Sequence, residues 1–178
     1  MRVYLEGMRV YLRVLAALLF LVLAGCAPRL GISNTQRSEW GLEAIISGFA
    51  PDRGEGGKYN LRERVFFGFT LSKAGYVTLV TTDPDTTTVV LERSVELPAG
   101  THTFPLKTDR NAQGQATYLV LPPTGLSRFR LIYTDAPVQA SGLFSGKLSE
   151  DQLNRQTQTY IASAKSRDVA ETNMETVQ

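Results

Sequence analysis

Apolar and polar residues alternate with a period of two at 64–71 and again within 128–134, and other β-rich runs lie between residues 42 and 121. The clearest run is 64–71, whose apolar positions are Val65, Phe67, Phe69 and Leu71. Such alternation is typical of a half-buried strand, because successive side chains of a strand point to opposite faces. We therefore expect these four side chains to point into a core. The pattern also predicts strands at 42–49, 76–82, 87–92, 101–106, 116–121 and 128–134.

Turn residues separate these predicted strands. Asp83-Pro84-Asp85, Pro98-Ala99-Gly100 and Pro122-Pro123-Thr124-Gly125 carry the prolines, aspartates and glycines that favour turns, and residues 50–60 read as a glycine-rich, charged loop. No helix-length periodic segment lies between the strands, which argues against an α/β fold. The fold class predicted is mostly β, an antiparallel β-sandwich of about seven strands with one C-terminal amphipathic helix.

The C-terminal helix is predicted over residues 149–165. Ser149, followed by Glu150 and Asp151, is typical of a helix start. The apolar stripe at helical spacing consists of Leu153, Thr157, Tyr160, Ile161 and Ala164. This stripe must pack either on the sandwich itself or in the groove of a partner. We favour the sandwich, because Leu143 and Phe144 can anchor the connection. Residues 166–178 fit an edge strand or a loose tail.

The N-terminus has the features of a bacterial export signal. Arg2, Arg9 and Arg13 precede an uncharged apolar or small run from Val14 to Gly25, which is too short to span a bilayer. The run ends in Leu23-Ala24-Gly25-Cys26, which resembles the lipobox of bacterial lipoproteins and contains the only cysteine of the chain. The resemblance implies that the signal is removed before Cys26 and that the cysteine is lipidated. The repeated opening, MRVYLEG and MRVYLRV, leaves Met1 and Met8 both possible as the translation start.

These predictions divide the chain into four parts. They are a signal peptide (1–25), a lipidated tether (26–40), a β-sandwich (41–137) and a C-terminal helix and tail packed on the sandwich (138–178). Trp40 is expected to begin the folded part. Ala27 and Pro28 follow the cysteine without an aspartate, which resembles outer-membrane sorting in a bacterium with two membranes and implies the cell surface in a bacterium with one.

Residues 59–137 resemble the bacterial domain of unknown function 4384. The resemblance rests on YNLRERVFFGFTLSKAGYVTLVTTDPDTTTVVL (59–91), on LPAGTHTFPL and on the strand Arg-Phe-Arg-Leu-Ile-Tyr. It implies an accessory β-sandwich of exported or envelope proteins without established catalysis, and it supplies no functional residues. Thr86 stands where that family usually has glycine, so we expect a different hairpin conformation there.

Charge and chemistry narrow the function further. Without the three arginines and one glutamate of residues 1–25, sixteen basic and sixteen acidic residues remain, and no clustered basic face suggests nucleic-acid binding. His102, the single histidine, is interpreted as structural. Asp83 and Asp85 are interpreted as turn formers in preference to a weak calcium site. Arg128 and Arg130 are expected to cover an outer sheet face. No cofactor, metal or catalytic motif is predicted.

The sequence thus predicts a membrane-anchored, non-catalytic lipoprotein of the cell envelope. Its expected partners are the membrane, through the lipid, and an envelope protein or cell-wall component. An assembly or pilotin-like factor of a secretion or pilus machine is the alternative. A small hydrolase is less favoured, because no nucleophile, base or metal cluster is recognisable.

Overall fold

The computed structural model describes residues 31–106 and 117–178. They form two helices, α2 (Asn34–Glu39) and α3 (Glu150–Ile161). The strands are β1 (Ile46–Pro51), β2 (Gly57–Asn60), β3 (Arg64–Val65), β4 (Phe67–Leu71), β5 (Gly75–Thr82), β6 (Thr87–Leu97), β7 (Gly100–Phe104), β8 (Tyr118–Leu119), β9 (Gly125–Thr134), β10 (Gly146–Lys147) and β11 (Arg167–Val177). The lipobox and Cys26 lie outside the described residues, as do residues 107–116.

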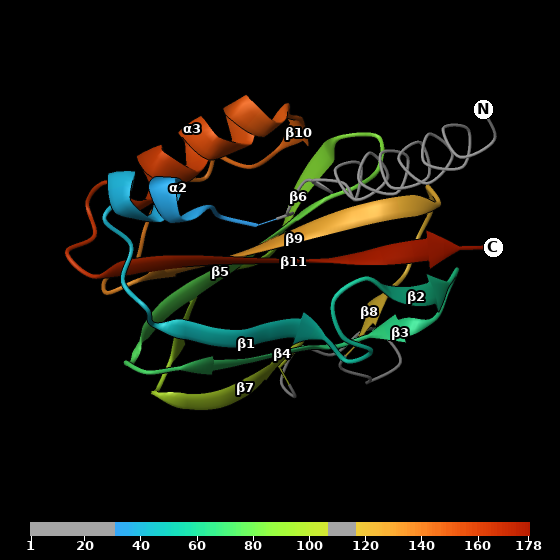
Figure 1. Cartoon of the computed structure of the whole chain (residues 1–178), viewed down its shortest axis with the longest axis horizontal. Coiled ribbons are helices and arrows are strands. Elements are labelled where there is room, and N and C mark those ends of the chain that lie inside the picture. The colour runs from blue at the N-terminus through green and yellow to red at the C-terminus, as the bar shows by residue number, and fades with distance from the viewer. Residues whose placement is uncertain (1–30, 107–116) are drawn as a thin grey trace, which may run out of the picture.

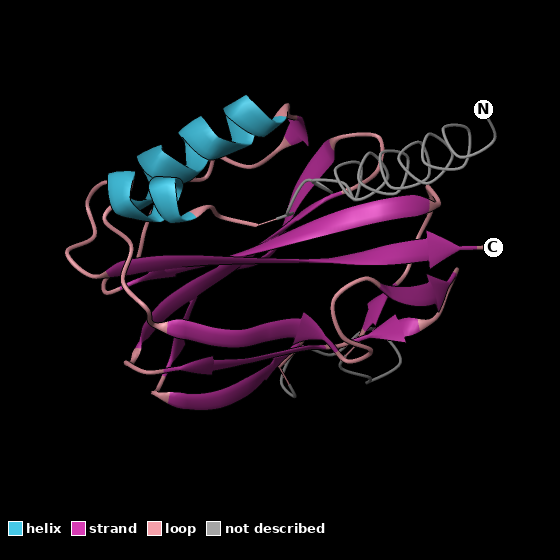
Figure 2. Cartoon of the chain, in the orientation of Figure 1, coloured by secondary structure: helices cyan, strands magenta, loops and turns pink. Residues whose placement is uncertain are grey.

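The strands form a sandwich with a helical layer on one outer face (Figure 1). A six-stranded sheet has the order β10-β6-β5-β9-β11-β2, a three-stranded sheet has the order β1-β4-β7, and β3 pairs with β8 in a small third sheet. Neighbouring strands are antiparallel except β11 and β2, which run parallel. In Figure 2 both helices lie on the same side of the strands. The predicted mostly-β, sandwich-like fold with a C-terminal helix is confirmed, although eleven strands rather than seven occur in the described residues.

The main core lies between the six-stranded and three-stranded sheets. Val65, Phe67, Phe69 and Leu71 are all buried in it, which confirms the predicted face of this strand. On β9, Phe129, Leu131 and Tyr133 point into the same core. The predicted single strand 64–71 is divided, however. Val65 pairs with β8, whereas Phe67 pairs with β1 and β7, because the chain passes from one sheet to another at Phe66.

A second core lies beneath the helices, on the other face of the six-stranded sheet. Leu153, Tyr160 and Ile161 of α3 pack there with Val80 and Ile132 of the sheet. The hydroxyl groups of Tyr160 and Thr78 of β5 share a buried hydrogen bond of 2.7 Å. The prediction that the helix packs on its own domain is confirmed. Neither described helix is long and apolar enough to cross a membrane.

The expected edge strand or loose tail at the C-terminus is in fact an inner strand. β11 lies between β9 and β2, and it pairs with β9 from Arg167 to Thr176. Its polar sequence hides this position, because Asp168 and Asn173 are buried with hydrogen-bond partners. The sandwich therefore extends to Val177, and the predicted boundary at residue 137 is wrong.

The predicted tether is also wrong over its last part. Ser33 caps α2 through a capping box with Gln36, in which each side chain bonds the other residue's backbone N–H. Arg37 then bonds the buried carboxylate of Asp168 at 2.7 Å. Trp40, the expected first folded residue, is the C-cap of this helix and is buried. The Ser-x-x-Gln sequence was the signal for this helix.

Several strand limits differ because irregular residues interrupt the pattern. β1 starts at Ile46 and continues past a bulge, where Gly48 has φ 63°, to Pro51. β2 lies inside the segment expected as a loop (50–60) and is held by parallel pairing to β11. β6 extends to Leu97 beyond a bulge at which Ser94 has φ 49°. Alternation of apolar and polar residues does not predict strand pairing that continues past a bulge or pairing with a strand distant in the sequence.

Candidate binding site

One end of the sandwich is hollowed by a pocket of about 240 Å³, here called the end pocket. It lies between the inner face of the six-stranded sheet and the small β3–β8 sheet. Figure 1 places β3 and β8 beside the end of the molecule at which β11 finishes. The lining residues are Val65, Phe67, Thr81, Asp83, Val89, Leu91, Tyr118, Leu119, Val120, Leu121, Ser127, Phe129, Met174 and Thr176.

The segment 118–121 forms one wall of the end pocket, and β3 and its flanking residues hold it in place. The amide of Val120 donates to the carbonyl of Glu63 at 2.9 Å, and the amide of Arg62 donates to the carbonyl of Val120 at 2.8 Å. The hydroxyl of Tyr118 hydrogen-bonds to Glu92 of β6. This wall therefore spans from the small sheet to the large one.

The walls are apolar from the core to the mouth. Phe67 and Phe129 are buried, with ring centroids 4.4 Å apart. At the mouth, Val89, Leu119 and Leu121 are 45%, 49% and 65% exposed. Only one further large apolar side chain among the described residues, Leu126, is comparably exposed. Exposed apolar side chains are therefore gathered at this opening, which is a feature of interaction sites.

One side of the pocket is polar. Asp83 is half-buried, and its carboxyl group accepts hydrogen bonds from Thr81 and Ser127. Burial raises the pKa of Asp83, and repulsion from Asp85 adds to the rise, whereas the two hydrogen bonds oppose it. The hydroxyl-bearing residue Thr176 is a further polar lining group. A ligand in the pocket would meet a carboxyl group and hydroxyls on one side and hydrocarbon elsewhere.

The hairpin that presents Asp83 is held by its own turn residues. The Asp85 carboxylate accepts from the Thr87 amide at 3.0 Å and from the Thr87 hydroxyl at 2.9 Å. The first of these bonds is the main cause of a lowered pKa of Asp85. Thr86 has φ 69°, which lies in the left-handed region that glycine usually occupies. In the described residues no three metal-ligating side chains cluster, here or elsewhere.

The other residues singled out in the sequence lie away from the pocket. His102, on β7, makes a 2.8 Å hydrogen bond through Nε2 with the carbonyl of Pro98, and its ring lies 5.6 Å from that of Phe69. Both contacts are structural.

The residues that line the end pocket were not identified as a site from the sequence. The signal was the segment Tyr118-Leu119-Val120-Leu121, in which both faces of a short strand are apolar.

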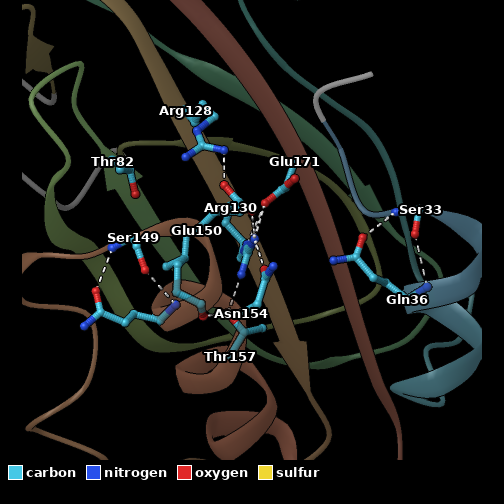
Figure 3. Close-up of polar contacts among 12 residues, drawn as sticks. Ser33, Gln36, Thr82, Arg128, Arg130, Ser149, Glu150, Asn154, Thr157 and Glu171 are labelled. Atoms are coloured by element: carbon cyan, nitrogen blue, oxygen red, sulfur yellow. Dashed lines mark hydrogen bonds and ion pairs between the residues drawn. The ribbon is translucent and has the colours of Figure 1, made fainter. Parts of the chain in front are cut away.

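The two arginines of β9 lie on the outer, helix-covered face of the six-stranded sheet (Figure 3). Arg130 is 2% exposed and contacts Glu171 on β11. It also donates to Thr157 at 2.6 Å and to Asn154 at 2.8 Å, both on α3. Arg128 pairs with Glu150 at the start of the helix. The expected position on an outer face of the sheet is confirmed, and helix α3 packs over that face.

No family model, curated protein or solved structure matches this chain. The resemblance to the domain of unknown function 4384 therefore stays a prediction.

Proposed function

We propose that this chain is a lipid-anchored, non-catalytic lipoprotein of the cell envelope, whose β-sandwich binds another envelope component through the end pocket. The observation that carries this proposal is the pocket itself. It is a preformed cavity of about 240 Å³ with exposed leucines at its mouth and few polar groups inside. Binding sites typically combine apolar walls with a small number of placed polar groups.

The anchor proposed at Cys26 would hold the domain near the bilayer. Six residues separate Cys26 from the helix cap Ser33, which makes seven Cα–Cα steps. A chain of that length spans at most about 25 Å when fully extended. Because α2 belongs to the helical layer, the lipid would be attached on the helix-covered side of the six-stranded sheet (Figure 1). The end pocket lies on the other side of that sheet, where a second component of the envelope could reach it.

Metabolic labelling with an alkynyl fatty acid tests the anchor. We expect the wild-type chain to take up the label and Cys26→Ser to take up none, with the domain still folded. The lipid adds roughly 0.8 kcal/mol of membrane affinity per buried CH₂ group, so the variant should also leave the membrane fraction. An unlabelled wild-type chain would contradict the lipoprotein assignment.

Cross-linked capture from envelope membranes tests the binding role. Leu121→Asp places a charge at the mouth of the pocket, whereas Leu126→Asp places the same charge at an exposed leucine that does not line it. We expect the same envelope component to be captured by wild type and by Leu126→Asp but not by Leu121→Asp. Equal capture by both variants would exclude the end pocket as the binding surface. Capture of a secretion or pilus component would favour the assembly-factor alternative.

A further inference from the structure

Asp83 is the only charged side chain among the described residues that line the end pocket. Its neighbour Asp85 pairs with Lys147 at 3.3 Å, but no cation among the described residues pairs with Asp83. Among the described residues, the Asp83 carboxylate therefore lies half-buried at an apolar pocket, and its polar neighbours are the hydroxyl groups of Thr81 and Ser127. A half-buried carboxylate without a countercharge is left with an unfavourable desolvation cost.

We propose that the end pocket binds an alkylammonium group, whose carbon chain packs on the apolar walls while its ammonium meets the Asp83 carboxylate. This assignment rests on the proposed use of the end pocket as the binding site. It names the chemical class of the ligand.

The geometry favours an ammonium over the other head groups. A carboxylate ligand would be repelled by both Asp83 and Asp85. A neutral apolar ligand would bury Asp83 further without supplying a positive charge. An ammonium has three N–H donors. One can bond the Asp83 carboxylate, and the lone pairs of the Ser127 and Thr176 hydroxyls can accept the others. Hydrogen bonds between charged partners are roughly twice as strong as neutral ones.

The carbon chain of such a ligand has matching walls. Val65, Phe67 and Phe129 close the buried end of the pocket, and Leu119 and Leu121 form its mouth. The cavity is smaller than the roughly 300–1,000 Å³ typical of sites for drug-sized ligands. A short, unbranched or singly ringed group is therefore the expected size.

Calorimetric titration of the full-length protein in detergent micelles tests the assignment, with protein-free micelles as the blank. The probes are n-hexylamine, n-hexanol and hexanoate, which share a chain length and differ in the head group. We expect n-hexylamine to bind at least about tenfold more tightly than n-hexanol, and hexanoate to bind least, because a charge-assisted hydrogen bond contributes about 1.5–3 kcal/mol.

Two matched variants locate the head group. Asp83→Asn should weaken n-hexylamine binding about tenfold and leave n-hexanol unchanged, whereas Asp85→Asn should change neither by more than about twofold. Binding of the amine should also weaken in acid as Asp83 takes up a proton. Asp85 and Lys147, the charged groups beside it on this hairpin and on β10, form a pair of their own.

The outcomes separate this inference from the proposed function. If n-hexanol binds as tightly as n-hexylamine and Asp83→Asn has no effect, the pocket binds apolar ligands but the ammonium assignment is wrong. If none of the three probes binds and the Leu121→Asp variant still captures the envelope component, the end pocket is excluded as a binding site. A further arm uses Nα-acetyl-lysine amide. Binding equal to that of n-hexylamine would identify a lysine side chain as the source of the ammonium, and weaker binding would identify a free amine.

Discussion

The two faces of the six-stranded sheet differ in how their polar groups are satisfied. On the helix-covered face, Arg130 is almost fully buried, and it has partners on β11 and on α3. On the inner face, the polar neighbours that the described residues give the Asp83 carboxylate are hydroxyl groups, and the buried hydroxyl of Thr172 has no hydrogen-bond partner among these residues. The first face is closed by its own side chains. The second face has polar groups that can still accept or donate hydrogen bonds, and it opens at the end pocket. Both features are required of a binding site.

Both faces come from the same strands, because alternate residues of β9 point to opposite sides. Phe129 and Leu131 point into the inner core, and Arg130 and Ile132 point toward the helices. The inner face is stabilised mainly by apolar packing. The outer face is stabilised by a smaller apolar core together with a buried ion pair. Substitutions on each face should therefore differ in size and in their response to pH.

The largest effect is expected in the inner core. Phe69 is 2% exposed, and its ring lies 5.1 Å from that of Phe104. Phe69→Ala should lower the free energy of unfolding by about 3–5 kcal/mol, because it leaves a cavity among packed rings. Denaturant unfolding measures this. The control is Phe66→Ala, a half-buried neighbour that should cost less. An effect of Phe69→Ala no larger than that of the control would contradict the strand register.

The next effect tests the buried ion pair on the helix-covered face. Arg130→Met leaves Glu171, which is 13% exposed, without its guanidinium partner. The free energy of unfolding should fall by about 2–4 kcal/mol. Arg130→Met combined with Glu171→Leu should recover part of this loss, because no unpaired carboxylate remains. A double variant that loses the sum of the two single effects would show that the pair is not coupled.

The regular parts of this fold were predictable from the sequence, and the polar inner strand was not. Val65, Phe67, Phe69 and Leu71 alternate cleanly, so local pattern alone predicted their buried face. β11 carries Asp168, Asn173 and Thr176 at buried positions, and only partners distant in the sequence make that burial favourable. The end pocket was missed for a related reason. It depends on residues 118–121 facing β9 and β11 across the cavity, and no local pattern encodes this arrangement.

A smaller effect is expected at the start of α3. The hydroxyl of Ser149 accepts from the amide of Gln152, and the Gln152 side chain accepts from the amide of Ser149. Ser149→Ala should lower the free energy of unfolding by about 1 kcal/mol. Ser149→Gly should lower it by only a few tenths of a kcal/mol. Thermal melts of the two variants measure the difference. Equal costs would mean that the helix is held by its packing and not by its cap.

The smallest effect on stability is expected at Asp83, and its sign should be opposite to that at Asp85. Burial raises the pKa of Asp83, so the folded state keeps its proton to a higher pH than the unfolded state does. Stability is therefore lost as the pH rises from the ordinary aspartate pKa of about 3.9 through the raised value. Asp83→Asn cannot ionise and should melt slightly above wild type near neutral pH. The difference should vanish in acid, below both pKa values.

Asp85→Asn, on the same hairpin, should change the melting temperature near neutral pH in the opposite direction. Hydrogen bonds from Thr87 lower the pKa of Asp85, so its carboxylate stabilises the fold above the ordinary pKa, and this contribution is lost as the pH falls through the lowered value. The variant should melt below wild type near neutral pH and match it in acid. If Asp83→Asn also melts below wild type near neutral pH, the bonds from Thr81 and Ser127 outweigh burial. The carboxylate is then satisfied without a ligand, which contradicts the proposed ammonium partner.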